Sequence, residues 1–400
     1  MEKVRVAAAG HICLDIIPDL SGVKGAGEED SFIIPGRLLR IGPASIALGG
    51  AVPNTGIALA RLGMDTTLMG KIGDDLLAKT ILCALQEAGL EHLDFESGMI
   101  QAKGETSSYT VVFSPPHQDR CFLHCSGAND TFSPEDLDPE RFEGVRLLHF
   151  GYPTLMREIY TQPKAFAKKL EKIREKGTLI SLDVTMPDPD GPEGKLDWED
   201  WFRTVLPFVD IYLPSLEETL FMLDRERFEE VSRRLHRTVV KSGETLNPAT
   251  LLEFSEIDAL AKRLLDLGVE VAGIKLGDEG IYLRTVKEPE RITAEMPKNV
   301  ALQWADRKLL AQCYEVPVAG TTGSGDCTIA GFLTGLLHCW PPKQTLRFAA
   351  AVGACNVQKA DATSGIPSME EVLNRSRKWS LKESQLHPEE VGAETTAKCA

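Results

Sequence analysis

The stretch TTGSGDCTIAGFL, residues 321–333, joins a glycine-rich turn to an apolar helix with small residues on one face. The first backbone N–H groups of such a helix, from about Gly323 to Asp326, have no partner within the helix and converge on one spot. The helix dipole adds positive potential there, so the arrangement binds phosphate or developing negative charge. Asp326 lies inside it, either as a helix cap or as a base that takes a proton from an attacking hydroxyl.

A second glycine-rich segment, LGGAVPNTG at residues 48–56, also precedes a predicted helix. Gly49 and Gly50 let a ligand approach the backbone, and Asn54 offers both a donor and an acceptor. Asp15 follows the first strand-like segment and supplies an acceptor-only carboxylate. Because such a pair can bracket neighbouring hydroxyls, Asp15 and Asn54 predict a polyol ligand. A charge on a turn or on the surface of a lid is the alternative for Asp15.

Short apolar segments alternate with amphipathic helical segments along most of the chain. This alternation predicts an α/β fold with a mostly parallel sheet covered by helices. Residues 11–48 and 105–126 instead contain alternating runs typical of hairpins, so we expect a small second sheet that forms a lid; an edge extension of the main sheet is the alternative. The expected strands are 4–10, 66–70, 145–150, 178–184, 209–213, 271–276 and 281–284. The expected helices are 53–62, 76–88, 162–175, 217–235 and 256–267.

The composition excludes several classes of protein. With 44 Lys+Arg against 59 Asp+Glu, the net charge is −15, which argues against a general nucleic-acid binder. No stretch approaches the ~20 apolar residues of a membrane helix, the N-terminus lacks the pattern of a signal peptide, and the nine cysteines are scattered. We therefore expect a cytoplasmic protein without a membrane partner. Residues 225–255 and 285–312 are expected to be functional or mobile connections, and 376–400 a poorly ordered polar tail.

Taken together, the two glycine-rich segments, with ARLG at residues 60–63, resemble the two signatures of the ribokinase-like (PfkB) carbohydrate kinases. The resemblance runs over roughly residues 4–375 in the family's order and spacing, so we expect one kinase domain over 1–375. It implies a ribokinase-like three-layer fold with a small β-sheet lid. It also implies transfer of the ATP γ-phosphoryl group to a hydroxyl, usually of a sugar or a nucleoside. P-loop and protein-kinase motifs are absent from the sequence.

The resemblance also implies roles for individual residues. Asp326 matches the catalytic base, and the anion hole is matched by Gly323, Ser324 and Gly325. The positions that match substrate-binding residues are Asp15, Gly49, Gly50 and Asn54. The positions on the nucleotide side are Lys275, Gly277, Gly280, Thr321, Asn356 and Gly365. Glu218 matches a position linked to Mg²⁺, so ATP and Mg²⁺ are expected, and a homodimer through the lid is a further implication.

Three positions depart from the family pattern. Gly320 stands where the family commonly has an Asp that helps to hold a monovalent cation, which leaves activation by K⁺ open. Ser215 replaces the Asn of the N-x-x-E motif that ends at Glu218, and Thr185 stands where an Asn is frequent. None of these changes removes the predicted base or the glycine-rich helix start.

The leading hypothesis is an ATP-dependent carbohydrate kinase in which Asp326 accepts the proton of a primary hydroxyl. Closure of the lid would exclude water from the reaction. A nucleoside kinase of the same fold is one alternative, with base-stacking groups among Phe32, Tyr109, Phe113 and Phe122. A non-catalytic sensor of sugar or nucleotide is another, motivated by the departures at Ser215 and at position 320.

Overall fold

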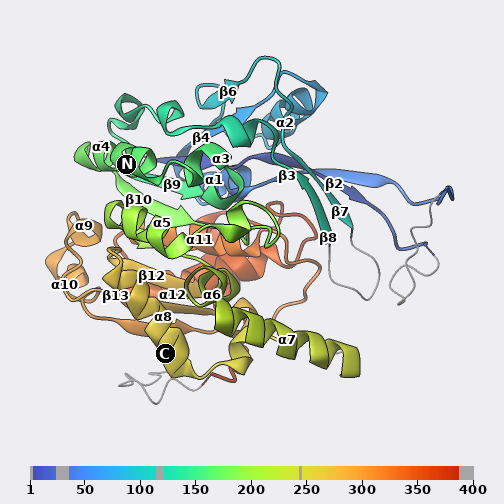
Figure 1. The fold of residues 1–400 in the computed structure, drawn as a ribbon. Coiled ribbons are helices and arrows are strands. Elements are labelled where there is room, and N and C mark those ends of the chain that lie inside the picture. The colour runs from blue at the N-terminus through green and yellow to red at the C-terminus, as the bar shows by residue number, and fades with distance from the viewer. Residues whose placement is uncertain (1–2, 24–35, 114–120, 243–245, 387–400) are drawn as a thin grey trace.

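Helices cover both faces of a large, mostly parallel sheet in the computed structural model, which describes residues 3–23, 36–113, 121–242 and 246–386 (Figure 1). Within these residues the sheet has ten strands in the order β14-β13-β12-β11-β10-β9-β1-β4-β5, with β6 paired to β4. The pairs from β5 to β12 are parallel, and β13 and β14 are antiparallel at one edge. The strands are β1 (Arg5–Gly10), β4 (Asp65–Ile72), β5 (Leu93–Asp94), β6 (Met99–Gln101), β9 (Leu147–Gly151), β10 (Leu179–Asp183), β11 (Ile211–Tyr212), β12 (Val271–Lys275), β13 (Ile281–Thr285) and β14 (Lys308–Ala311).

Alternate residues of the central strands enter two different hydrophobic cores. In β9, Leu148 and Phe150 pack into one core and Leu147 into the other. Because helices cover both faces, β9 and β10 are buried along their whole length, as parallel strands in covered sheets are. This confirms the predicted layers. The helices are α1 (Ala51–Arg61), α2 (Leu76–Glu87), α3 (Arg157–Tyr160), α4 (Pro163–Glu175), α5 (Trp198–Val205), α6 (Leu216–Leu223), α7 (Arg225–Ser242), α8 (Phe254–Asp266), α9 (Glu290–Thr293), α10 (Lys298–Ala301), α11 (Ser324–Leu337), α12 (Pro342–Asn356) and α13 (Met369–Ser376).

A second, smaller sheet stands away from the main one, at the right of Figure 1. In the described residues it has the order β3-β2-β7-β8, and we call it the lid sheet. Its strands are β2 (Cys13–Pro18), β3 (Ala44–Gly49), β7 (Tyr109–Phe113) and β8 (Cys121–Cys125). The separate sheet predicted from residues 11–48 and 105–126 is therefore confirmed, and the alternative of an edge extension of the main sheet is wrong.

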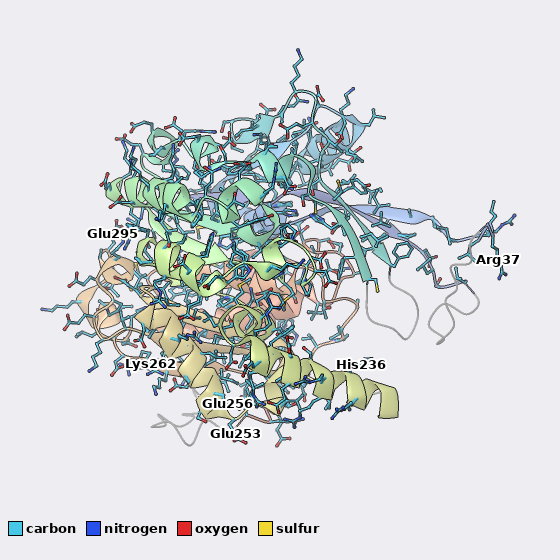
Figure 2. All side chains as sticks on the ribbon, viewed as in Figure 1. Arg37, His236, Glu253, Glu256, Lys262 and Glu295 are labelled. Carbon is cyan, nitrogen blue, oxygen red and sulfur yellow. The ribbon has the colours of Figure 1, made fainter. Side chains whose placement is uncertain are left out.

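The predicted helix 217–235 is two helices, α6 and α7. Asp224 leaves helical geometry between them, and its Oδ1 accepts a hydrogen bond from the backbone N–H of Arg227, as an N-cap does. The expectation of a long connection over 225–255 is thus wrong, since much of it is the helix α7, on which His236 lies (Figure 2). Arg227 ties this helix to α8 by an ion pair with Glu256.

Residues 285–312 are likewise structured. They contain α9, α10 and β14, and Trp304 anchors them in the second core with its Nε1 donating to the carbonyl of Trp340.

The first part of the predicted polar tail packs against the fold. Leu381 bridges to Tyr314, and Leu386 is buried in the first core. The rest of that predicted tail, 387–400, lies outside the described residues. Across the described chain, no helix combines the length and the apolar character needed to span a membrane.

Candidate active site

Polar side chains gather at the carboxyl ends of four parallel strands. His11 follows β1, Tyr152 follows β9, Asp183 ends β10 and Lys275 ends β12. The strand register places Gly10, Gly151 and Asp183 side by side across β1, β9 and β10. In open α/β sheets ligands bind at this edge, so the fold itself brings these residues to a candidate site.

The start of α11 faces this edge. Its N-cap, Gly323, has φ 71°, in the left-handed region. A Cβ atom at Gly323 would lie 2.6 Å from the Cβ of Ala362, so both the backbone and the space require glycine. The predicted Ser324 and Gly325 are the first two residues of the helix, where the N–H groups have no partner within the helix. The structure therefore places the predicted anion-binding residues at one helix start.

Asp326 is buried in the first turn of α11 and is held by side chains from other elements. Nδ2 of Asn54 on α1 donates to Oδ2 at 2.9 Å, and the hydroxyl of Tyr152 lies 2.8 Å from Oδ1 and 2.9 Å from Oδ2. The carboxylate thus bonds across the site rather than to the backbone of its own helix. Burial raises its pKa, and the bond from Asn54, the charge of Lys275 and the bond from Tyr152 oppose that rise.

Tyr152 is a residue that the sequence analysis missed. It follows the last residue of β9 with φ 61°, a left-handed conformation that few non-glycine residues adopt. Burial, followed by the nearby Asp326, raises the pKa of its hydroxyl well above the usual range, so the hydroxyl keeps its proton and can donate it. A tyrosine directly after a buried parallel strand was the one signal in the sequence that could have identified it.

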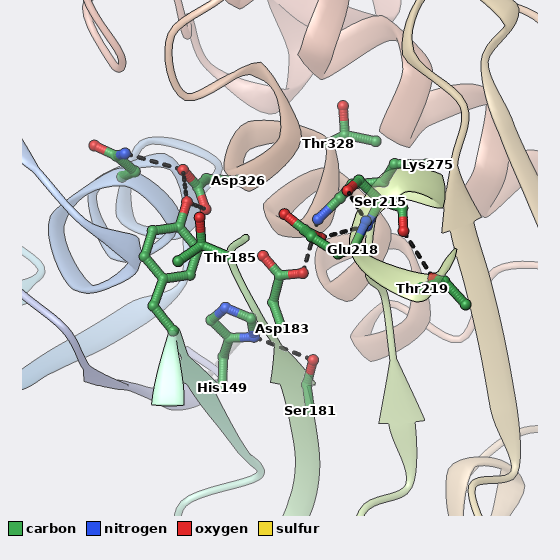
Figure 3. A network of polar contacts seen from close by, with 12 residues as sticks. His149, Ser181, Asp183, Thr185, Ser215, Glu218, Thr219, Lys275, Asp326 and Thr328 are labelled. Carbon is green, nitrogen blue, oxygen red and sulfur yellow. Dashed lines mark hydrogen bonds and ion pairs between the residues drawn. The ribbon is translucent and has the colours of Figure 1, made fainter. Parts of the chain in front are cut away.

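Lys275 is the cation at the centre of an acidic group (Figure 3). Its Nζ lies 2.8 Å from Oδ1 of Asp183, and both side chains are largely buried. Burial alone would lower the pKa of Lys275, but the carboxylates of Asp183 and Glu218 outweigh it and raise the pKa. Burial raises the pKa of Asp183 and of Glu218, and Lys275 opposes the rise in both. Lys275 and Glu218 are predicted site residues, whereas the role of Asp183 emerges only from the structure.

The departure at Ser215 leaves the start of α6 intact. Oγ of Ser215 accepts from the backbone N–H of Glu218 at 3.3 Å, and Oε2 of Glu218 accepts from the backbone N–H of Ser215 at 2.7 Å. This reciprocal pair is a capping box. It holds one oxygen of Glu218 and fixes the direction of the other. At the third departure, the carbonyl of Thr185 accepts from the hydroxyl of Thr154 at 2.9 Å.

A cavity of about 510 Å³, which we call the first cavity, opens beside the start of α11. Most of its surface is apolar, and it is closed by residues of the β12–β13 turn, of α11 and α12, and of the chain around Tyr314. Its lining includes six residues that were predicted from the sequence: Lys275, Gly277, Gly280, Thr321, Ser324 and Gly325. Lys382 and Tyr314 were not foreseen.

Two residues predicted for the nucleotide side are not among the described residues that line this cavity. Asn356 is fully buried at the end of α12, and its Nδ2 donates to the carbonyl of Ala362 at 2.6 Å. A Cβ at Gly365 would lie 2.6 Å from the carbonyl oxygen of Cys355. The structure thus places both behind the cavity wall, where they brace the loop after α12, while Gly353 and Ala354 of the same helix face the cavity.

The remaining predicted residues lie between α1 and the lid sheet. A Cβ at Gly49 would lie 2.5 Å from Oδ1 of Asp15, whose side chain would have to move. Gly50 has φ 93°, and a Cβ there would lie 2.6 Å from the carbonyl oxygen of His11, so this position needs glycine. Burial raises the pKa of Asp15. His11 also meets His124 of β8, with 3.4 Å between their Nε2 atoms, so the lid sheet contacts the core here.

A second cavity, of about 820 Å³, lies between β3 and the loops around residues 318–322 and 360–363. Its described lining includes Ser45, Thr321 and Gly320. Asp15, Gly49, Gly50 and Asn54 are not part of that lining. Among them, Asn54 contacts Asp326, and Asp15 lies against Gly49 at the end of β3.

Comparisons with known proteins agree with this fold. Residues 26–369 match the family described as "pfkB family carbohydrate kinase". Probable fructokinase-3 of Arabidopsis thaliana is 22% identical over 400 residues, covering 96% of this chain and 96% of that protein. Two solved structures cover 94% of this chain and 99% of their own: ribokinase of Arabidopsis thaliana complexed with ribose and ATP (TM-score 0.67, 19% identity), and a putative ribokinase II from E. coli in complex with ATP and Mg²⁺ (TM-score 0.66, 17% identity). The family match spans most of the chain, which therefore belongs to the pfkB family of carbohydrate kinases.

Proposed function

We propose that this chain transfers the γ-phosphoryl group of ATP to a hydroxyl group of a sugar. The observation that carries the proposal is the position of Asp326, a buried carboxylate in the helical turn whose Ser324 and Gly325 line the first cavity. A base for phosphoryl transfer must lie beside the groups that hold the phosphoryl, and here one turn supplies both. The complexes of related proteins with ribose and ATP, and with ATP and Mg²⁺, support this assignment of ligands.

In the proposed reaction, a primary hydroxyl of the sugar attacks the γ-phosphorus in line with the leaving ADP. The new O–P bond forms as the bond to the β,γ-bridging oxygen breaks, and the hydroxyl proton passes to Asp326. The N–H groups in the first turn of α11 stabilise the charge on the phosphoryl oxygens. Asp326 then releases its proton to solvent, and closure of the lid sheet keeps water from the phosphoryl group until then.

The carboxylates of Asp183 and Glu218 fit a Mg²⁺ ion that is held largely by other ligands. Mg²⁺ keeps several waters and is usually bound by one or two carboxylates together with substrate phosphates. The part of the chain that the structure describes contains no group of three or more His, Cys, Asp or Glu side chains that could hold a metal ion. When bound, Mg²⁺ would neutralise phosphate charge. Glu218 and Asp183 would hold it from the side of Lys275.

A K⁺ ion is expected to change the rate little. Gly320 supplies no carboxylate, and a Cβ there would lie 3.0 Å from the Cα of Ala360 and 3.2 Å from the carbonyl oxygen of Lys359. An aspartate at this position would therefore require the neighbouring backbone to move. The direct check is turnover in K⁺ compared with tetramethylammonium at equal ionic strength.

The alternative of a nucleoside kinase would need aromatic groups free to stack on a base. Tyr109 is half-buried and packs against a core cluster under the lid sheet. Phe122 is 57% exposed on β8, and Phe32 lies outside the described residues. The alternative of a non-catalytic sensor has less support, because the proposed base and its neighbours Asn54 and Tyr152 are in contact.

The test is ADP release over a panel of sugars and nucleosides with Mg²⁺, with detection of the phosphorylated product by mass spectrometry. Turnover of a hexose or pentose that Asp326→Asn abolishes supports the proposal. Turnover of a nucleoside but of no sugar supports the alternative of a nucleoside kinase. If calorimetry shows that sugar and ATP bind but no phosphorylated product forms, the alternative of a non-catalytic sensor is supported.

A homodimer through the lid sheet is a further proposal. Ile46, Phe122 and Leu123 are exposed apolar side chains on its strands. Burying such side chains against a second copy would be favourable. Analytical ultracentrifugation of the wild type and of Leu123→Ser tests it, since a dimer through this face should weaken in the variant.

A further inference from the structure

The two oxygens of the Asp326 carboxylate accept different sets of hydrogen bonds. Oδ2 accepts from both Asn54 and Tyr152, whereas Tyr152 is the one donor to Oδ1 among the described residues. The tyrosine hydroxyl has a single proton, shared between two oxygens at 2.8 and 2.9 Å. This leaves Oδ1 with the greater capacity to accept a further hydrogen bond, and the orientation of the carboxyl plane depends on Tyr152 as well as on Asn54.

The surrounding structure holds Tyr152 in place at some cost. Its φ of 61° is in the left-handed region, where a non-glycine side chain is disfavoured and is retained only if its neighbours enforce it. Its backbone N–H donates to the carbonyl of Asp183 at 3.1 Å, and its own carbonyl accepts from the backbone N–H of Leu155. On the other side, its ring lies 6.0 Å from the ring of His11.

We propose that Tyr152 is a positioning residue for the proposed transfer reaction: its hydroxyl orients the carboxylate of Asp326 and keeps Oδ1 directed at the acceptor hydroxyl. This inference rests on the proposed function. It adds that the base depends on a residue from the end of β9, a segment that neither glycine-rich signature contains. The left-handed turn at Tyr152 serves to bring the hydroxyl to the carboxylate.

Loss of this hydroxyl has a defined electrostatic consequence. The groups that act on Asp326 are Asn54 from α1, Tyr152 after β9, and Lys275 from β12. The acidic neighbours Asp183 on β10 and Glu218 on α6 also interact with Lys275. Without the Tyr152 hydroxyl, fewer groups oppose the rise that burial causes in the pKa of Asp326. The carboxylate therefore takes up its proton at a higher pH.

The test compares Tyr152→Phe with Tyr160→Phe, a matched control. Tyr160 is a buried tyrosine on α3, packed in the core that contains Leu148 and Phe150, and is not part of the site. Tyr152→Phe should lower kcat about 10- to 100-fold, the value of a hydrogen bond to a charged group, and change the KM for the sugar less than about threefold. The acidic limb of the pH profile should move to higher pH. Tyr160→Phe should match the wild type in kcat, in the KM for the sugar and in the pH profile.

A second measurement does not depend on turnover. Proteins carrying ¹³C at the aspartate carboxyl carbons are titrated by NMR, and the signal of Asp326 is assigned by its loss in Asp326→Asn. Tyr152→Phe should move this titration to higher pH, and Tyr160→Phe should not. If Asp326 titrates at the same pH in Tyr152→Phe as in the wild type, the proposal is overturned, even if no sugar is a substrate. A raised KM with unchanged kcat would also overturn it, because Tyr152 would then be only a substrate contact.

Discussion

The ammonium nitrogen of Lys275 lies 2.8 Å from Oδ1 of Asp183, and the two side chains are 14% and 2% exposed. The pair joins the carboxyl ends of β12 and β10, two strands separated in the sheet by β11. Glu218 on α6 adds a second carboxylate to the same cation. One lysine therefore balances a buried acidic group next to the proposed site of phosphoryl transfer, so it contributes to folding as well as to the site.

Lys275→Met should destabilise the protein strongly. Removal of one partner of a buried ion pair leaves an uncompensated charge and typically costs about 3–5 kcal/mol. The double variant Asp183→Asn with Lys275→Met should recover part of that loss. Lys308→Met is the control, since its pair with Asp258 is more exposed, Asp258 keeps Arg284, and such pairs contribute below about 1 kcal/mol. Urea unfolding measures all three, and equal losses in the two single variants would contradict the expectation.

Asp326→Asn should lower kcat at least about 10³-fold and leave the affinity for ATP nearly unchanged, because it removes the proposed base and keeps the shape of the site. The same change should raise or preserve the melting temperature at neutral pH. Burial raises the pKa of Asp326 above its unfolded value, so the stability linked to its proton is present at low pH and is lost as pH rises through the folded pKa. The advantage of asparagine should therefore shrink as pH falls toward the usual range of a carboxyl. A scan of melting temperature against pH checks the sign, and near-wild-type turnover would remove the assignment of the base.

Gly323→Ala should reduce both stability and turnover. The left-handed φ alone costs about 1 kcal/mol for a residue with a Cβ. Here the added atom also meets Ala362 at 2.6 Å, so the start of α11 must shift. Gly177→Ala is a matched control, because its φ is 86° with open space around the new atom. Only the variant at Gly323 should lower kcat, by roughly 10²-fold as for loss of one anion-hole donor. Equal kcat values for the two variants would argue against an anion hole at this turn.

Local patterns in the sequence predicted the elements well, because periodicity and glycine placement act over short distances. The helix starts at Gly323 and Gly50 and the alternating strands fall in this class. The contacts that complete the site do not, since Tyr152 meets Asp326 across 174 residues of chain. Which strands are neighbours decides that contact, and no single segment encodes it. The extension of the polar helix α7 beyond residue 235 was missed for a related reason, because a pair that holds this helix, Arg227 with Glu256, spans two elements.

The chain after α13 provides a further test, because its Lys382 forms part of one wall of the first cavity. The backbone of Lys382 donates to the carbonyl of Cys313 at 2.8 Å, and the Lys382 side chain lines the cavity and pairs with Asp278. Oε2 of Glu279 then accepts from the hydroxyl of Ser384 at 2.6 Å and from the backbone N–H of Gln385 at 3.0 Å. Glu279 is itself buried in the turn after β12, so the segment is fastened directly to the proposed nucleotide side.

Glu279→Ala should therefore loosen this wall. Each of the two donors would lose its acceptor, at roughly 1 kcal/mol apiece, which corresponds to about a 3- to 30-fold rise in the KM for ATP if the wall contacts the nucleotide. The KM for the sugar should stay unchanged, because the residues predicted to bind it, on the lid sheet and α1, are not among the residues that line the first cavity. Glu371→Ala, which removes an exposed carboxylate on α13 paired with Arg375, is the control and should alter neither constant. Equal rises in both KM values for Glu279→Ala would indicate general loosening of the fold, and an unchanged KM for ATP would show that the segment does not contact the nucleotide.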